Sequence, residues 1–292
     1  MNHFNPTFIK SIRYLLNLVG LRPVRQFPFV RRMFAYRKPR HVRNVLNPNF
    51  FTPVSLTPAD EFREVKANTL YRIWTQIPGA HKWMHYFSTY QSVVSHFDER
   101  PIRMLEIGIY KGGSLRMWRD YLRAESVIVG IDIDPSCQKF ERQEENVFVR
   151  IGDQSNQNFL NEVVREFGPF DFILDDGSHV CSHMIASFNY LFLCGLKDGG
   201  VYLAEDTHSN FWSGYRDRSY SFLDLSKDLV DLMHAYYWEH QSEVLFRKDH
   251  AQRAENISVP RICSEISEIR FADSLVTIYK SRSKKMPISV HL

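Results

Sequence analysis

Two short runs of acidic residues and histidine in this sequence could support chemistry. Asp175-Asp176-Gly177-Ser178-His179 follows the apolar run 170–174, and Glu205-Asp206-Thr207-His208 follows a second apolar run, 200–204. Neighbouring carboxylates repel each other and lose hydration on burial, so such a pair usually contacts a cation or a ribose hydroxyl. Either run alone could be a solvated turn. If the two preceding strands are neighbours, however, four carboxylates and two histidines meet at one edge of a sheet.

Strands and helices alternate along the chain in a way that would bring these runs together. We expect strands at 103–109, 127–133, 147–151, 170–174 and 200–204, and helices at 115–122, 184–192 and 222–236. This alternation predicts an α/β fold with a doubly wound, mostly parallel, seven-stranded sheet. Two late strands, 242–246 and 270–279, would complete the sheet as an antiparallel hairpin. In such sheets, ligands bind at the carboxyl ends of the strands.

Further polar residues follow the first three strands, and their types suit an adenosine. A glycine-rich turn at 108–114 lets the backbone approach a ligand closely, but its spacing is not that of a dinucleotide site. Asp132 can accept hydrogen bonds from ribose hydroxyls, although each such acid could instead be a helix cap. An adenosine without a pyrophosphate, beside a carboxylate cluster, suggests S-adenosylmethionine and a divalent metal. The predicted cofactor contacts are Glu106, Gly108, Tyr110, Gly112, Gly113, Ser114, Asp132, Asp153, Gln154 and Asp175.

From about residue 81 to residue 280, the sequence resembles a known enzyme family. The segments that carry the resemblance are His81-Lys82-Trp83, Leu105–Gly108, Gly112–Trp118, Gly130–Ile133, Gly152–Ser155, Asp175–His179, Glu205–His208 and Phe271–Val276. They are similar to those of the class I methyltransferases that modify sugar hydroxyls of macrolide antibiotics. This is the mycinamicin and rhamnosyl O-methyltransferase group, which is akin to the cephalosporin-hydroxylase-like proteins. The resemblance implies methyl transfer from S-adenosylmethionine to a hydroxyl, most simply of a sugar in a glycoside or polysaccharide.

The resemblance also implies roles for the two acidic runs. Mg²⁺ would be held by an Asp at the fourth strand end and by the Glu-Asp pair at the fifth, because Mg²⁺ prefers hard oxygen ligands. The implied metal ligands are Asp175 or Asp176, Glu205 and Asp206. His179 and His208 are the candidates for the general base, although His179 could instead fix the turn. Relatives have a His before the aromatic residue of the last strand, where this chain has Arg270.

Other interpretations of the same residues remain open. His179, Cys181 and His183 form a His-x-Cys-x-His run, but no second ligand pair stands nearby, which disfavours zinc. A metal-dependent hydroxylase or hydrolase could use the same acidic edge. A non-catalytic, membrane-attached assembly factor could also retain the fold.

The first 59 residues differ in charge from the rest of the chain. They contain ten Lys or Arg and no Asp or Glu, whereas the remainder has 27 basic and 33 acidic residues. Residues 8–19 have apolar side chains at helical spacing. We predict that residues 1–45 contact an anionic membrane surface or pack on another subunit, as in a homo-oligomer. A transit peptide is an alternative, and a nucleic-acid arm is disfavoured.

The rest of the chain is divided into a helical segment, 60–100, and a methyltransferase domain, 101–292. Trp83, Phe87 and Tyr90 are expected to share one helix face against the core, while Lys82, His85 and Tyr86 suggest a lid over the site. Four scattered cysteines and no apolar run long enough to span a bilayer favour a cytoplasmic protein, peripheral at the inner face of a membrane if the arm binds there.

Overall fold

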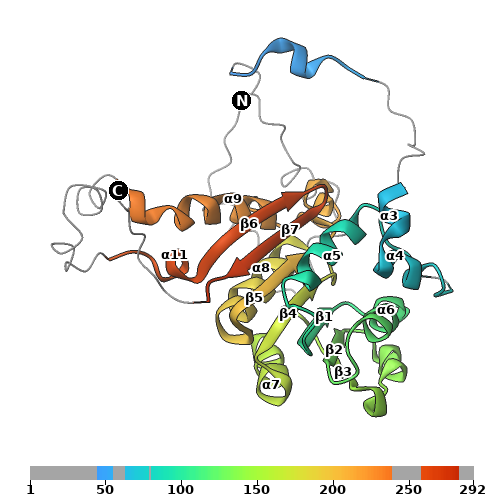
Figure 1. The fold of residues 1–292 in the computed structure, drawn as a ribbon. Coiled ribbons are helices and arrows are strands. Elements are labelled where there is room, and N and C mark those ends of the chain that lie inside the picture. The colour runs from blue at the N-terminus through green and yellow to red at the C-terminus, as the bar shows by residue number, and fades with distance from the viewer. Residues whose placement is uncertain (1–44, 55–62, 79, 239–257, 283–292) are drawn as a thin grey trace, which may run out of the picture.

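The computed structural model describes residues 45–54, 63–78, 80–238 and 258–282. At its centre is one seven-stranded sheet with the order β3-β2-β1-β4-β5-β7-β6 (Figure 1). Its strands are β1 (Arg103–Ile107), β2 (Val127–Asp132), β3 (Val147–Ile151), β4 (Phe170–Asp175), β5 (Leu196–Ala204), β6 (Ile266–Ala272) and β7 (Leu275–Lys280). Strands β1 to β5 run parallel, and β7 is antiparallel to both β5 and β6. The predicted doubly wound, mostly parallel sheet is confirmed.

Helices cover both faces of this sheet. Residues of α4 (Thr69–Trp74), α5 (Tyr86–Ser95) and α6 (Gly113–Tyr121) pack into one core cluster, with α3 (Arg63–Ala67) next to α4. The second cluster, on the other face, includes residues of α7 (Gln157–Phe167), α8 (Cys181–Tyr190) and α9 (Phe222–Met233). The short helix α11 (Arg261–Glu265) precedes β6 and contacts α9.

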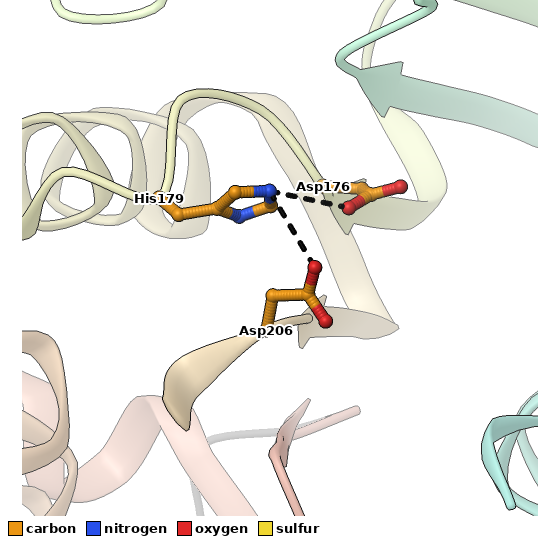
Figure 2. Close-up of side chains that lie close together, drawn as sticks. All are labelled: Asp176, His179 and Asp206. Carbon is orange, nitrogen blue, oxygen red and sulfur yellow. Dashed lines mark ion pairs between the residues drawn. The ribbon is translucent and has the colours of Figure 1, made fainter. Parts of the chain in front are cut away.

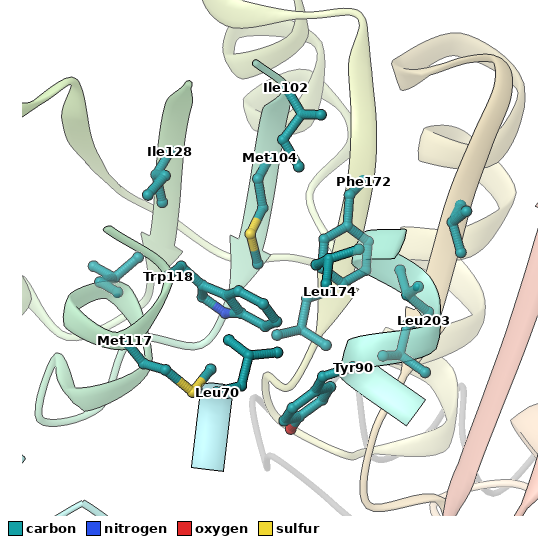
Figure 3. Packing of buried hydrophobic residues seen from close by; sticks show 14 of the residues in the cluster. Leu70, Tyr90, Ile102, Met104, Met117, Trp118, Ile128, Phe172, Leu174 and Leu203 are labelled. Atoms are coloured by element: carbon teal, nitrogen blue, oxygen red, sulfur yellow. The ribbon is translucent and has the colours of Figure 1, made fainter. Parts of the chain in front are cut away.

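The first core cluster attaches the segment before β1 to the sheet (Figure 3). Leu70 of α4 and Tyr90 of α5 are fully buried, together with Trp118 of α6 and Phe172 of β4. The Trp118 ring lies 5.4 Å from the Tyr90 ring and 5.7 Å from the Phe172 ring, both edge to face. Full burial of a large apolar side chain stabilises a fold by about 1.5–3 kcal/mol, so these contacts hold α4 and α5 firmly on the sheet.

The antiparallel end of the sheet differs from the sequence prediction. The predicted single strand 270–279 is wrong, because the chain reverses at Asp273-Ser274 and forms the hairpin of β6 and β7. Ser274 has a φ of 64°, the left-handed conformation that such a tight reversal requires. The polar pair Asp273-Ser274 between the apolar pairs Phe271-Ala272 and Leu275-Val276 marks the turn. The other predicted late strand, 242–246, lies outside the described residues.

The segment before β1 is less uniformly helical than predicted. Helix α4 ends at Trp74, α5 begins at Tyr86, and residues 80–83 form neither helix nor strand. The expected common face of Trp83, Phe87 and Tyr90 is therefore wrong at Trp83, which precedes the helix and is 49% exposed, whereas Phe87 and Tyr90 are buried. This break releases residues 80–83 from helical geometry and lets them extend over the ends of the strands.

Several expectations concern the arm or the whole chain. The predicted arm, 1–45, lies almost wholly outside the described residues. All four cysteines are described and unpaired. Within the described part of the chain, every helix is too short or too polar to cross a lipid bilayer.

Candidate functional site

The register of the sheet aligns the carboxyl ends of its parallel strands. Ile107 of β1 pairs with Ile131 of β2 on one side and with Asp175 of β4 on the other, and Asp175 in turn pairs with Ala204 of β5. Backbone hydrogen bonds continue for one residue beyond the strands, from Asp176 N to Ile107 O at 3.0 Å and from Glu205 N to Asp175 O at 2.9 Å. The residues that follow the strands therefore meet along one edge.

A cavity of about 470 Å³ opens along this edge. Its wall is formed by the glycine-rich turn, by the segments after β2 and β3, by the two acidic runs and by residues 80–83. Most of the predicted site residues line it, namely Gly108, Tyr110, Gly113, Ser114, Asp132, Asp153, Gln154, Asp176, His179, Glu205 and Asp206. Glu106, Gly112, Asp175 and His208 do not form part of this wall.

The glycine-rich turn is shaped by contacts with neighbouring chain segments. Gly108 has a φ of 92°, and a Cβ there would lie 2.1 Å from the backbone oxygen of Asp176. Gly112 has a φ of 74°, and a Cβ there would lie 2.6 Å from the ring of Phe140. Only glycine fits these two places without strain, and the turn delivers the first residues of α6 to the cavity wall.

Asp132 fixes the other side of this turn. Its Oδ2 accepts hydrogen bonds from the backbone N–H groups of Ile109 at 2.8 Å and Tyr110 at 3.0 Å, and its Oδ1 accepts one from Asp134 at 2.9 Å. Burial alone would raise the pKa of Asp132, but these backbone donors lower it overall. Asp132 is thus held ionised at the cavity wall, where it presents an acceptor for hydroxyl groups.

Gln154 and Asp175 bond mainly to other side chains. The buried Gln154 amide accepts from Ser178 N at 2.7 Å and donates to Asp175 Oδ1 at 3.1 Å. The other Asp175 oxygen accepts from the Tyr202 hydroxyl at 2.6 Å. Burial raises the pKa of Asp175 to about 6, although these hydrogen bonds oppose the shift. Asp175 therefore belongs to the interior support of the turn after β4, and Asp176 is the acid of that pair that reaches the cavity.

Three carboxylates and one imidazole gather where β4 and β5 end. The Nε2 atom of His179 lies 3.8 Å from Asp176 Oδ1 and 3.6 Å from Asp206 Oδ2, so one ring nitrogen faces both acids (Figure 2). Possible ligand atoms of Asp176, His179 and Asp206 all lie within 4.8 Å of one another. Glu205 is buried beside them. His179 has a φ of 55°, and its Nδ1 atom is buried without a hydrogen-bond partner among the described residues.

Three side chains from the segment before β1 contact these acids. The Lys82 ammonium pairs with Asp176 and, at 2.6 Å, with Glu205 Oε2. The Tyr90 hydroxyl donates to Glu205 Oε1, and the Tyr86 hydroxyl donates to Asp206 Oδ1 at 2.6 Å. Sequence reasoning placed Lys82 and Tyr86 in a lid and Tyr90 in the core. The signal that could have identified them is a Lys followed by two Tyr four residues apart, which places both hydroxyls on one helix face.

Burial alters the protonation of this cluster. Burial alone lowers the pKa of Lys82, yet the charges of Asp176 and Glu205 outweigh it and raise that pKa above its usual value. Burial and the Asp176 charge raise the pKa of Glu205, while Lys82 opposes this. Burial raises the pKa of Glu106 to about 8, against the influence of Lys82 and Ser114. Neither Glu106 oxygen has a hydrogen bond of ordinary geometry within the described residues. Lys82 is therefore buried among several acids, and burial favours the protonated forms of Glu106 and Glu205.

The remaining candidates, apart from His183, do not line the cavity. His208 Nδ1 contacts the Ser274 hydroxyl and lies 3.9 Å from Asp206 Oδ1, so it borders the cluster from outside. Cys181 is buried, and His183 lines the cavity wall with its Nδ1 atom 3.0 Å from the Ser178 hydroxyl. Arg270 lies on the edge strand β6, where it pairs with Glu268 of the same strand and with Ser92 of α5. It is not part of the cavity wall.

The sequence is similar to those of curated sugar O-methyltransferases. It is 34% identical over 173 residues to the 8-demethyl-8-alpha-L-rhamnosyl tetracenomycin-C 2'-O-methyltransferase of Streptomyces olivaceus, a match that covers 54% of this chain and 44% of that protein. It is 35% identical over 168 residues to the demethylmacrocin O-methyltransferase of Streptomyces fradiae, covering 51% and 41% of the two chains. The chain thus spans less than half the length of these relatives. No protein-family model matches it.

Solved structures agree with the sequence comparison. The MycE methyltransferase from the mycinamycin biosynthetic pathway, in complex with Mg, SAH and mycinamycin VI, superimposes with a TM-score of 0.58 at 27% identity, over 73% of this chain and 53% of that one. A second MycE complex, with Mg and SAH, gives a TM-score of 0.57 at 25% identity over 80% and 58% of the two chains. The sheet order and this superposition show that the chain has the class I methyltransferase fold. Over about half of its length the chain is similar to S-adenosylmethionine-dependent sugar O-methyltransferases.

Proposed function

We propose that this protein transfers a methyl group from S-adenosylmethionine to a hydroxyl group of a sugar, in a glycoside or a polysaccharide, with the help of a divalent metal. The observation that carries the proposal is the grouping of Asp176 and Asp206 at His179, with Glu205 joined to Asp176 through Lys82, in a cavity that reaches Asp132 and the glycine-rich turn. The curated relatives, named as sugar O-methyltransferases, support this reaction over a hydroxylase or hydrolase.

The chemistry of the donor set fits Mg²⁺. Asp176, Glu205 and Asp206 offer hard carboxylate oxygens, which Mg²⁺ prefers over nitrogen and sulfur ligands. These oxygens carry a net negative charge that Lys82 only partly balances. We assign Asp176, Glu205 and Asp206 as the residues that hold the metal, and Asp175 as a supporting residue.

The other half of the cavity fits an adenosine-containing cofactor. Its volume lies in the range of cofactor and small-ligand sites, about 300–1,000 Å³. The glycine-rich turn allows close approach of a ligand to the backbone, and the Asp132 carboxylate is positioned to accept hydrogen bonds from ribose hydroxyls. We assign Gly108, Tyr110, Gly113, Ser114, Asp132 and Asp153 to this half.

The residues of the chain then have separate tasks. When bound, S-adenosylmethionine supplies the methyl group, and the metal supplies positive charge that lowers the pKa of a bound hydroxyl. The Nε2 atom of His179 faces two acids at the cavity, so it is the atom we assign to accept the hydroxyl proton. Tyr86 and Tyr90 orient Asp206 and Glu205 by hydrogen bonds, and the rigid sheet edge fixes the separation of the two halves.

The test combines cofactor binding with turnover. We expect S-adenosylhomocysteine (SAH) to bind the purified full chain in isothermal titration calorimetry. We also expect a panel of rhamnosides and other deoxysugar glycosides to gain the mass of one methyl group, with loss of turnover in EDTA and recovery with Mg²⁺. Absence of SAH binding would reject the methyltransferase proposal, and turnover that survives EDTA would reject the metal.

We further propose that residues 1–45 attach the protein to an anionic membrane surface at its cytoplasmic side. The ten basic residues and the absence of acids in the first 59 residues support this. We expect the full chain, but not a variant lacking residues 1–45, to sediment with phosphatidylserine vesicles. Equal sedimentation of both would contradict the proposal, and a change of molecular mass in solution would favour subunit packing.

A further inference from the structure

Lys82 occupies the same carboxylate oxygens that the proposed metal would use. Its ammonium contacts Asp176 Oδ2 and lies 2.6 Å from Glu205 Oε2. The other Glu205 oxygen accepts a hydrogen bond from Tyr90. Both oxygens of Glu205 are thus engaged, whereas Asp176 Oδ1 and Asp206 Oδ2 face His179. Of the three acids, Glu205 is the one whose access to a metal depends on another side chain moving.

Charge makes a shared position unfavourable. A Mg²⁺ ion lies about 2.1 Å from its oxygen ligands, so an ion on Glu205 Oε2 would lie within about 5 Å of the Lys82 ammonium. The Lys82 side chain is only 6% exposed, and the low dielectric around it strengthens repulsion between two cations. Asp176, Glu205 and Asp206 outnumber the single ammonium, so the cluster attracts a further cation while Lys82 opposes it.

Lys82 also lies on a segment that can shift without loss of a helix or strand. Residues 80–83 have no regular secondary structure, and α5 begins only at Tyr86. Buried Tyr90 and Phe87 anchor the following helix to the core, so movement can be confined to the residues before it. Trp83, the residue after Lys82, is half exposed at the cavity wall.

We propose that the Lys82 ammonium is a built-in competitor of the divalent cation, which holds Glu205 and Asp176 together without metal and leaves Glu205 when the cation binds. This inference rests on the proposed metal site. It makes Lys82 a positioning residue that lowers metal affinity and couples metal loading to movement of residues 80–83 over the cavity.

The first experiment measures Mn²⁺ binding to the metal-free full chain by electron paramagnetic resonance of the free ion. The variant Lys82→Met removes the charge and keeps the chain length, Lys82→Arg keeps the charge, and Lys111→Met removes a different charge from the cavity wall. We expect Lys82→Met to bind Mn²⁺ at least about tenfold more tightly than the natural protein, because repulsion from one buried charge is lost. We expect Lys82→Arg and Lys111→Met to stay within about threefold.

Unchanged or weaker binding in Lys82→Met overturns the proposal, because a lysine that only supports the fold would not tighten metal binding when removed. If the natural protein binds Mn²⁺ and the variant binds it equally, the metal site of the proposed function stands and only the competition fails. If the natural protein binds none and the variant binds it, competition is supported. If neither binds, both ideas fail.

A second experiment uses the natural protein and does not depend on folding of a variant. Acetic anhydride labels exposed amines, and peptide mass spectrometry reports each lysine separately. We expect Mn²⁺ to increase labelling of Lys82 by at least about threefold while Lys111 stays unchanged, since a displaced ammonium gains solvent exposure. Equal labelling of Lys82 with and without Mn²⁺ overturns the proposal.

Discussion

The two halves of the site are built in different ways. The half at the ends of β1 to β3 is held by contacts with the main chain, in which Asp132 accepts from three backbone N–H groups and Gly108 packs on the backbone of Asp176. The half at the ends of β4 and β5 is held by side chains from the segment before β1, at sequence separations of about 90 to 120 residues.

This difference has a physical consequence. Backbone contacts are fixed by the sheet and the turn, so the glycine-rich half has one conformation that the fold itself stabilises. Side-chain contacts across elements can be exchanged for others at modest cost, so the acidic half can change its partners when a cation arrives. The cofactor half has a fixed shape, whereas the acidic half can exchange its side-chain partners. This combination suits a reaction in which the metal and the acceptor bind and leave.

The strongest change to the acidic half is Asp176→Asn. We expect it to weaken Mn²⁺ binding at least about 100-fold, because a charged metal ligand is removed. This exceeds the usual effect of losing a residue that only hydrogen-bonds a ligand. SAH affinity should stay within about threefold, because the substitution leaves the Asp176 backbone that contacts Gly108 unchanged. Calorimetry with each ligand measures both. Asp120→Asn, on the exposed surface of α6, is the control, and a parallel loss of SAH binding would contradict the separation of the halves.

Gly108→Ala tests the place where the two halves touch. The added Cβ would meet the Asp176 carbonyl at 2.1 Å, and the φ of 92° is strained for alanine. We expect the free energy of unfolding to fall by about 2 kcal/mol, measured by urea titration, with weaker binding of both SAH and Mn²⁺. Gly214→Ala is the control, since a Cβ at Gly214 would have nothing within 4 Å. Equal stability of the two variants would show that the turn is not under this constraint.

Glu106 tests how far the buried charge of the acidic half extends toward β1. Its pKa is raised to about 8 in the folded protein from 4.5, so the folded state holds a proton that the unfolded state loses between these values. The stability from this group is complete below about pH 4.5 and is lost as the pH rises through 8, with a slope of at most about 1.4 kcal/mol per pH unit. In urea titrations with EDTA at pH 5.5, 6.5 and 7.5, Glu106→Gln should show a smaller decline than the natural protein. Identical declines would place the titration elsewhere.

The smallest effect is expected for Tyr86→Phe. This change removes one hydrogen bond to Asp206 and leaves the ring in the core. We expect about fivefold weaker Mn²⁺ binding, near 1 kcal/mol, with SAH affinity unchanged. Tyr121→Phe, whose hydroxyl accepts from Gln91 away from the site, is the control. An equal effect of both variants would mean that Tyr86 acts through general stability.

Much of the fold could be predicted because its signals are local. Apolar runs predicted the five parallel strands, and their alternation with helices predicted the doubly wound sheet. The two-residue reversal at Asp273-Ser274 was missed, since strand-forming residues flank the polar pair on both sides. The break before α5 was missed because the residues around it have helical spacing.

The sequence by itself determined which residue types follow each strand, and hence the candidate acids, glycines and histidines of the site. Only the tertiary structure decided their roles, because adjacent residues at a strand end point in opposite directions. It turned Asp175 toward Tyr202 and Asp176 toward the cavity, and it placed His179 rather than His208 beside both acids. It also brought Lys82 onto Glu205, a contact across 123 residues that no local pattern encodes, since it depends on how the helices pack on the sheet.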